Sequence, residues 1–312
     1  MKMLNTRLIA LLLALAPLTL IAQELKKEFN RSFATTSETQ LMISNSFGEI
    51  QMESVDGNEI KIEAVIKVEG NSEKAVKEAI EKMNIVFLEE ANRVMVRTEN
   101  KCNCGNKIKE FSIDYKVQVP SGITVSLRNS FGDVYVQGHD GPVKLDVEHG
   151  DFKIKNLSHE ENFVKLSFGD GQASDINRME IRVQHSYFNA ENVEELSAYI
   201  QFSDVELENI TSLYRELRIQ HSDVSIDVSG SEWGKMMMDF DFSDVDMNVS
   251  SSARMRMEVE SSFGDVSAPS AMNVQKKENG FNSDYYRVSM NGESAPISQV
   301  SISHSDLSFS IR

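Results

Sequence analysis

The sequence contains only two cysteines, Cys102 and Cys104, and it has no excess of basic residues. Two cysteines separated by one residue do not match the four-ligand spacing of a structural zinc site. In an oxidising compartment they can form a disulfide; an idle surface pair, or a metal or redox role, are the alternatives. The formal net charge of −16 argues against nucleic acid and against an anionic membrane surface as partners.

No long hydrophobic run follows residue 22. Ahead of that point, Lys2 and Arg7 introduce an apolar run that ends at Ala22, which is the pattern of a signal peptide over residues 1–22. The run is shorter than the roughly 20 residues that a membrane-spanning helix needs. We therefore expect an exported protein without a transmembrane anchor, in the periplasm, at the cell surface or outside the cell. No cysteine stands at the cleavage point, which argues against a lipoprotein anchor.

A three-residue motif recurs along the chain: an aromatic residue or histidine, then glycine or serine, then an acid. Its third position returns from Asp133 to Asp265 at intervals of 17 to 21 residues, with Tyr187 as the exception to the acid. Further copies lie at residues 47–49 and 304–306. A fixed period of this kind indicates a repeat architecture.

Each repeat predicts two short strands around a bend. Near His149, Leu145 and Val147 alternate with polar residues before the bend, and Phe152 and Ile154 alternate after it. Such a pair cannot bury its apolar face alone, whereas stacked copies form a continuous core. We therefore predict an all-β protein, a single-stack β-solenoid over residues 23–312 with coils of about 17 to 21 residues. A β-sandwich of the same strands is the structural alternative.

Two segments interrupt the repeat. Residues 60–119 predict a small α+β insertion, because apolar residues at helical spacing follow Ser72 as a helix cap and strand patterns flank them. Residues 268–298 predict a degenerate coil or loop within the second gap.

The repeated motif also resembles a known family. Residues 46–49, 130–133 and 262–265 read Ser-Phe-Gly-acid, and they follow a predicted signal peptide. This combination is similar to the putative-adhesin family of bacterial exported proteins, domain of unknown function 4097. The resemblance implies a β-solenoid on the outside of a bacterium and supplies no catalytic residues.

The first motif position predicts a structural ladder of stacked rings that face inward. Its members include Phe131, His149, Phe168, His185, Phe202, His221, Phe242 and Phe263. The histidines are expected to replace phenylalanine as flat rings. The alternative is a proton switch, in which buried His149, His185 and His221 charge at acid pH and stability falls below about pH 6.

The third motif position predicts an acidic column. Its members include Asp133, Asp151, Asp170, Asp204, Asp223, Asp244 and Asp265. Stacked like charges repel, so we expect each carboxylate to accept backbone N–H groups at its bend. A row of calcium sites is the alternative, and calcium is the only cofactor that the sequence suggests. A further column, Asn156, Asp175, Asn192 and Asn209, predicts a left-handed corner.

These patterns favour a non-enzymatic exported protein of the cell envelope or surface, an adhesin or interaction scaffold. Its partner would be an envelope protein, a surface polysaccharide or a host surface. A calcium-associated envelope structural protein is one alternative. A carbohydrate-active β-helix enzyme of the lyase or hydrolase type is another, with Asp170, Asp151 and Lys165 as its best candidates, although no local cluster breaks the repeat.

Overall fold

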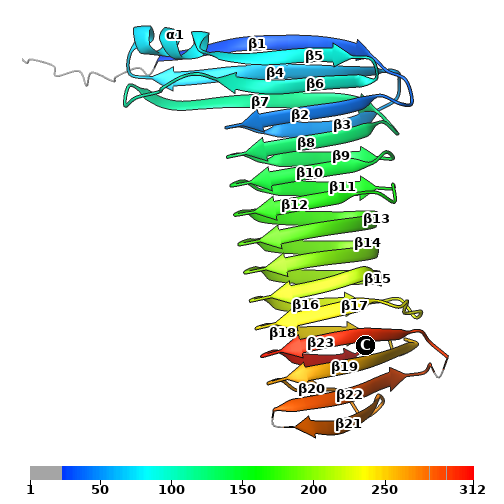
Figure 1. Ribbon diagram of the computed structural model, residues 1–312. Helices are drawn as coiled ribbons and strands as arrows, with labels where there is room; N and C mark the ends of the chain where they lie inside the picture. Colours follow the sequence, from blue (N-terminus) through cyan, green and yellow to red (C-terminus); the bar gives the residue numbers. More distant parts are fainter. Residues whose placement is uncertain (1–22, 281, 293) are drawn as a thin grey trace, which may run out of the picture.

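The computed structural model describes residues 23–280, 282–292 and 294–312; the predicted signal peptide lies outside them. The chain winds into a tall stack of coils with a wider cap at the N-terminal end and a β-hairpin at the other end (Figure 1). The predicted all-β solenoid is confirmed. In the described part of the chain, no helix is long and apolar enough to cross a membrane.

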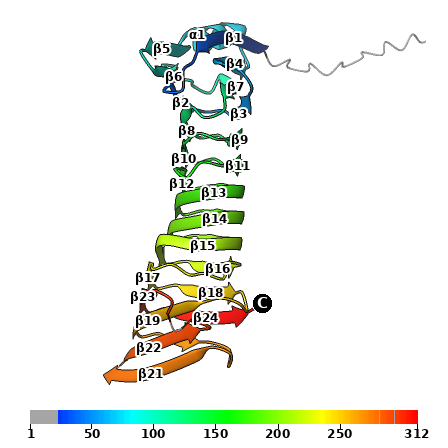
Figure 2. The same cartoon turned by 90° about the vertical axis from the view of Figure 1, so that its right-hand side faces the viewer.

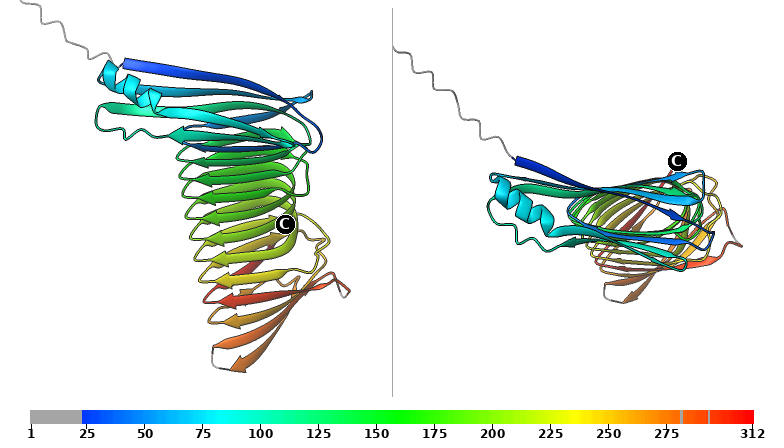
Figure 3. Two further views of the ribbon diagram at one scale, coloured as in Figure 1. Left: turned by 45° about the horizontal axis from the view of Figure 1, so that its top comes forward. Right: turned by 90° about the horizontal axis from the view of Figure 1, so that it is seen from above.

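Each coil supplies one strand to each of two faces, so that the stack has an elongated cross-section (Figure 3). The first face contains the strands that lead into the ring motif, and the second face contains those that follow it. The first-face strands are β2 (Gln40–Ser46), β8 (Thr124–Ser130), β10 (Val143–Glu148), β12 (Phe163–Ser167), β17 (Met237–Asp241), β23 (Ile297–Ser303) and β19 (Met255–Ser262). The second-face strands are β3 (Ile50–Val55), β9 (Val134–His139), β11 (Phe152–Leu157), β16 (Asp223–Val228), β18 (Asp244–Val249), β24 (Asp306–Ile311) and β20 (Val266–Ser267).

In the middle of the stack, three long strands run along the second face and turn into the first face without interruption. They are β13 (Asp170–Gln184), β14 (Tyr187–Gln201) and β15 (Asp204–Gln220), the broad bands of Figure 2. Neighbouring coils pair in parallel and in register, for example Gly171 with Phe188 and Phe188 with Val205. The core lies between the faces, where Leu145, Val147 and other inward residues are buried.

The N-terminal cap covers one end of this core. Its elements are β1 (Gln23–Ala34), β4 (Glu59–Gly70), α1 (Glu73–Glu81), β5 (Met83–Glu90), β6 (Arg93–Asn100) and β7 (Ile108–Pro120). β4 pairs antiparallel with both β1 and β7, and β7 pairs in parallel with β3 of the first coil. Helix α1 buries Val76 and Ala79; Ser72 stands at its N-cap, but its side chain makes no capping hydrogen bond.

The other end is closed by an antiparallel hairpin. Residues 268–298 contain β21 (Asn273–Gly280) and β22 (Ser283–Met290), which pair with each other, and β22 also pairs antiparallel with β19. The hairpin therefore ends the parallel stack at β19.

The last coil of the sequence is not the last coil of the stack. β23 pairs in parallel with β17 on one side and with β19 on the other. β24 likewise lies between β18 and β20. The C-terminal coil, formed by β23 and β24, is therefore inserted in space between the coil of β17 and β18 and the coil of β19 and β20, although it follows both in the sequence.

We expect cysteine cross-links to report this insertion. Asp239, Ser301 and Glu260 occupy one register position on β17, β23 and β19. The Asp239→Cys, Ser301→Cys pair should oxidise to a disulfide, because directly paired Cα atoms lie about 4.8 Å apart, within disulfide reach. The Asp239→Cys, Glu260→Cys pair should stay reduced, since a strand separates the two positions. Non-reducing mass mapping would measure both, and cross-linking of only the second pair would contradict the insertion.

Candidate functional site

The ring positions of all coils meet in one continuous row at the corner between the two faces. We call it the ring row; in spatial order it consists of Phe47, Phe131, His149, Phe168, His185, Phe202, His221, Phe242, His304 and Phe263. Successive ring centroids are 4.6 to 5.2 Å apart with interplanar angles of 6 to 14°. This spacing matches the distance between hydrogen-bonded strands.

Phenylalanine and histidine alternate strictly from Phe131 to the end of the ring row. In the sequence, Phe242 is followed by Phe263, but in space the inserted coil places His304 between them, at 4.6 and 4.8 Å. Each histidine therefore lies between two phenylalanine rings and contacts no other histidine of the row.

The ring row faces outward, so the expectation of an inward column is wrong. Phe131 is 53% exposed and Phe263 57% exposed, and all four histidines of the row are exposed. The reason is the backbone: every ring residue has a positive φ, between 49 and 65°. This left-handed residue breaks the alternation of the preceding strand and turns the side chain to the outside. The proton-switch hypothesis required His149, His185 and His221 to be buried, and all three are exposed.

The positive φ of the ring residues destabilises the backbone at this corner. A left-handed conformation costs an ordinary residue roughly 1 to 2 kcal/mol, and asparagine or glycine adopts it more readily. The opposite corner follows this rule with Asn156, Asp175, Asn192 and Asn209, all at φ between 51 and 57°. At the ring corner, stacking worth about 0.5 to 1.5 kcal/mol per pair offsets the strain. The ring residues thus occupy an exposed left-handed corner where smaller residues would fit.

Glycine or serine beside each ring allows the coils to approach closely. A Cβ atom added to Gly150 would lie 2.1 Å from the carbonyl oxygen of Gly132 in the neighbouring coil. Where serine replaces glycine, its hydroxyl joins the backbone network: Ser203 donates to the Gln201 carbonyl (2.7 Å) and accepts from the Ser186 N–H (3.2 Å). This serine ladder continues through Ser222, Ser243 and Ser305, which are all buried.

Three carboxylates of the acidic column, those of Asp133, Asp151 and Asp306, accept a backbone N–H group of the neighbouring coil. Asp133 accepts the N–H of Asp151 (2.9 Å), and Asp151 accepts the N–H of Asp170 (2.8 Å). At the far end, Asp306 accepts the N–H of Asp265 (2.9 Å). The acids therefore contribute to the stacking of coils.

Calcium binding by the acidic column stays a prediction. Over residues 23–280, 282–292 and 294–312, no three His, Cys, Asp or Glu side chains are grouped so that they could hold a metal ion. The enzyme candidates are not assembled either, because Lys165 pairs with Asp146 on the first face (3.5 Å) and not with Asp151 or Asp170.

At the opposite corner, amide side chains bond along the stack. Asn209 donates to Asn192 (2.6 Å), which donates to Asp175 (3.1 Å). These contacts satisfy the exposed polar groups of the corner, as expected for a structural column.

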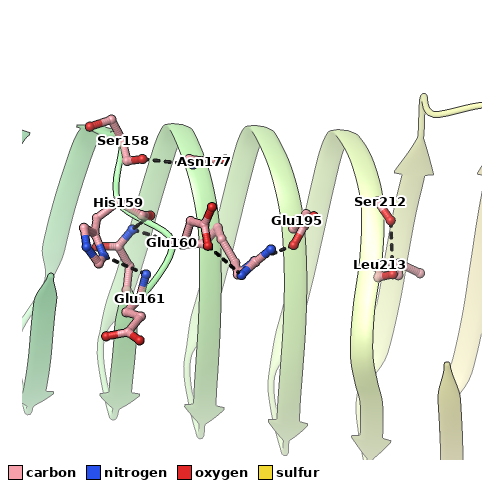
Figure 4. A network of polar contacts seen from close by, with 10 residues as sticks. Ser158, His159, Glu160, Glu161, Asn177, Glu195, Ser212 and Leu213 are labelled. Atoms are coloured by element: carbon pink, nitrogen blue, oxygen red, sulfur yellow. Dashed lines mark hydrogen bonds and ion pairs between the residues drawn. The ribbon is translucent and has the colours of Figure 1, made fainter. Parts of the chain in front are cut away.

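A polar network beside this corner departs from the repeat (Figure 4). The Arg178 guanidinium pairs with Glu195 of the next coil and, at 3.4 Å, with Glu160 of the preceding loop. It also lies 4.6 Å from the ring centroid of Tyr214, one coil further on. The network joins neighbouring coils at the surface, and sequence reasoning did not single it out.

The only deeply buried histidine among the described residues is His139, which sequence reasoning also missed. It is 1% exposed, with Nε2 2.8 Å from the Ile123 carbonyl and Nδ1 2.7 Å from the Ser54 hydroxyl. The proton of the neutral ring therefore sits on Nε2, and Nδ1 accepts from Ser54. Burial lowers the pKa of His139 below its usual value, although the bond to Ile123 opposes this effect.

Cys102 and Cys104 are bonded to each other in the loop between β6 and β7. The loop borders the end of α1.

No protein-family model matches the chain. No curated protein matches it either. Solved structures resemble it over most of its length. The alignment with a putative adhesin from Bacteroides fragilis covers 91% of this chain and 97% of that one, at 9% identity and a TM-score of 0.38.

Two further structures are similar to a comparable degree. A putative adhesin from Parabacteroides merdae is 11% identical, with 91% and 96% coverage and a TM-score of 0.36. A putative lipid binding protein from Parabacteroides distasonis is 10% identical, with 91% and 96% coverage and a TM-score of 0.34. Values this low support no transfer of function, so the family resemblance inferred from the motif stays a prediction.

We expect Gly150→Ala to destabilise the stack. The added methyl group would collide with the Gly132 backbone, so we expect a loss of about 1 to 3 kcal/mol in the free energy of unfolding. Gly234→Ala is the matched control, because no atom lies within 4 Å of its added Cβ; it should change stability by less than about 0.5 kcal/mol. Urea denaturation measures both, and equal effects would contradict the close approach.

We expect His139 to make stability depend on pH. Because its pKa is lowered in the folded state from 6.5, the unfolded chain binds a proton first as pH falls. Its contribution is complete above pH 6.5 and declines below it, down to the folded-state pKa. His139→Gln, which keeps a donor and an acceptor, should lose less stability between neutral and acid pH than the wild type. His159→Gln is the control; identical pH profiles for wild type and His139→Gln would refute the assignment.

Proposed function

We propose that the protein is a non-enzymatic, exported interaction scaffold of the bacterial cell envelope or surface, related to the adhesin family that its motif resembles. The solenoid presents the ring row to a partner of the envelope or of another surface. The exported location rests on the signal-peptide pattern at residues 1–22.

The observation that carries the proposal is the exposure of the ring row. Its six phenylalanines are 38 to 57% exposed and belong to one unbroken row, about 40 Å long for ten rings at strand spacing. Contiguous exposed apolar surface on a soluble protein marks an interaction site more often than scattered residues do. The strained backbone at every ring position supports the same view, since strain concentrates at functional sites.

The rings present their edges, because their faces are covered by neighbouring rings in the row. A shallow groove runs beside them, lined by ring, small and acidic positions from Gly169 to Phe242. A row of ring edges with exposed carboxylates at its side suits an extended partner that lies along the stack. The acidic surface disfavours nucleic acid as that partner.

The test is a variant that removes rings while keeping the corner. Phe168→Asn, Phe202→Asn and Phe242→Asn, combined, replace rings by a residue that tolerates positive φ, so relief of strain should offset lost stacking. We expect a folded protein whose binding to whole bacterial cells, measured with fluorescently labelled mature protein, falls at least tenfold.

The matched control removes three exposed apolar side chains elsewhere: Met42→Ser, Leu88→Ser and Met237→Ser. These residues are 41, 42 and 62% exposed, and the control should bind as the wild type does. Equal binding by the ring variant, or no binding by the wild type, would overturn the proposal. Release of new chain ends from acidic glycans, with or without calcium, would support the enzyme alternative instead.

A further inference from the structure

A second site lies where the N-terminal cap joins the solenoid, apart from the ring row. It is a pocket of about 740 Å³ on the outer side of the second face, within the range of ligand-binding pockets. Five neighbouring strands form its floor in the order β4, β7, β3, β9 and β11. We call it the cap pocket.

Two rows of outward side chains cross these strands. Glu63 of β4 lies opposite Lys116 of β7 at the start of one row. Lys116 is paired in turn with Gln51, Gln51 with Tyr135, and Tyr135 with Lys153. At strand spacing these four positions extend over about 14 Å parallel to the solenoid axis.

The second row runs two residues further along each strand. It begins at Lys61 of β4 and continues through Gln118 and Glu53 to Gln137 and Lys155. The Gln118 amide donates to Glu53 (2.8 Å), and Lys155 pairs with Asp175 at the pocket's edge (3.6 Å).

Three cations of the cap pocket have no partner. Lys61, Lys116 and Lys153 make no ion pair or side-chain hydrogen bond with any residue that the structure describes, whereas Lys155 of the same pocket pairs with Asp175. Four lysines line the pocket together with the three glutamates Glu49, Glu53 and Glu63. The pocket therefore has a small excess of positive charge, on a protein whose formal net charge is −16.

The lysines of these two register rows lie only at this end of the second face. On the following coils the same two register positions carry neutral Gln172 and Ser174, and further on Glu206 and Glu208. An anionic ligand that lies along the second face would therefore be attracted at the cap pocket and repelled beyond it.

Tyr135 gives the cap pocket an aromatic surface. Its ring is 38% exposed, and its hydroxyl donates to Asp133 (3.3 Å). The exposed ring offers an apolar surface between Gln51 and Lys153, while the amides and carboxylates of the pocket can bond hydroxyl groups.

We propose that the cap pocket binds a glycan that carries carboxylate groups. Lys116, Lys153 and Lys61 pair with the carboxylates through charge-assisted hydrogen bonds. The Tyr135 ring contacts the apolar face of a sugar, and Gln51 and Gln137 bond its hydroxyls. A free anion lacks the contacts with the ring and the amides, and a neutral glycan leaves the lysines unpaired.

Calorimetric titration of the mature protein tests this site, with tetragalacturonate and a hyaluronan hexasaccharide as acidic glycans. Cellohexaose is the neutral glycan, and inorganic phosphate is the free anion. We expect binding of at least one acidic glycan, weakened by added salt, and at least tenfold weaker binding of cellohexaose and phosphate. Lys116→Gln with Lys153→Gln, and separately Tyr135→Ala, should each weaken acidic-glycan binding at least tenfold without changing the melting temperature.

Two controls separate the cap pocket from the rest of the surface. Lys165→Gln removes a lysine that is paired with Asp146 on the first face, and Gln172→Ala changes the next coil of the same register row; both should bind as the wild type does. The ring-row variant should also keep glycan binding, so this proposal and the proposed function can fail separately. Absence of acidic-glycan binding by the wild type, or unchanged binding by the cap-pocket variants, would overturn the proposal.

Discussion

The parallel backbone pairing between successive coils is the constraint on which the rest of the structure depends. It sets one vertical spacing of about 4.8 Å for every side-chain column, and the ring centroids follow it within a few tenths of an ångström. A residue type that is acceptable in one coil must therefore be acceptable beside its equivalents above and below. Rings can stack face to face at this distance, amides can bond along it, and carboxylates need a neighbouring N–H group.

The same pairing creates the main liability of the fold, because each end of a parallel stack presents unpaired strand edges. At one end, β7 continues the parallel pairing before β4 and β1 change to antiparallel pairing, and α1 covers their apolar side. At the other end, β22 and β21 continue the first face as an antiparallel hairpin. The outermost strand there, β21, carries Lys276, Lys277 and Glu278, and such charges disfavour pairing with another chain. At both ends the pairing thus changes from parallel to antiparallel. The N-terminal end is also covered by α1, and the other end carries charged residues on its outermost strand.

The two surfaces described above differ in how they arise. The ring row belongs to every coil and extends as far as the stack does, whereas the cap pocket exists only where the longer cap strands meet the first coils. A repeating surface suits an extended partner, and a single pocket suits a ligand of defined length. The exposed rings and the unpaired lysines have in common that both leave groups at the surface that a partner can contact.

The sequence by itself determined the repeat, the two strands of each coil and the residue type of each column, because these depend on local alternation and on a fixed period. Leu145, Val147, Phe152 and Ile154 lie inside as the alternation predicts. The direction of the rings could not be read in this way, since the left-handed backbone at the corner reverses the alternation within one residue. Only the tertiary structure decided that His304 lies between Phe242 and Phe263, that His139 is buried against Ser54 and Ile123, and that Lys61, Lys116 and Lys153 share one pocket. Each of these depends on pairing between strands that are distant in sequence. Local periodicity does not determine which distant strands pair.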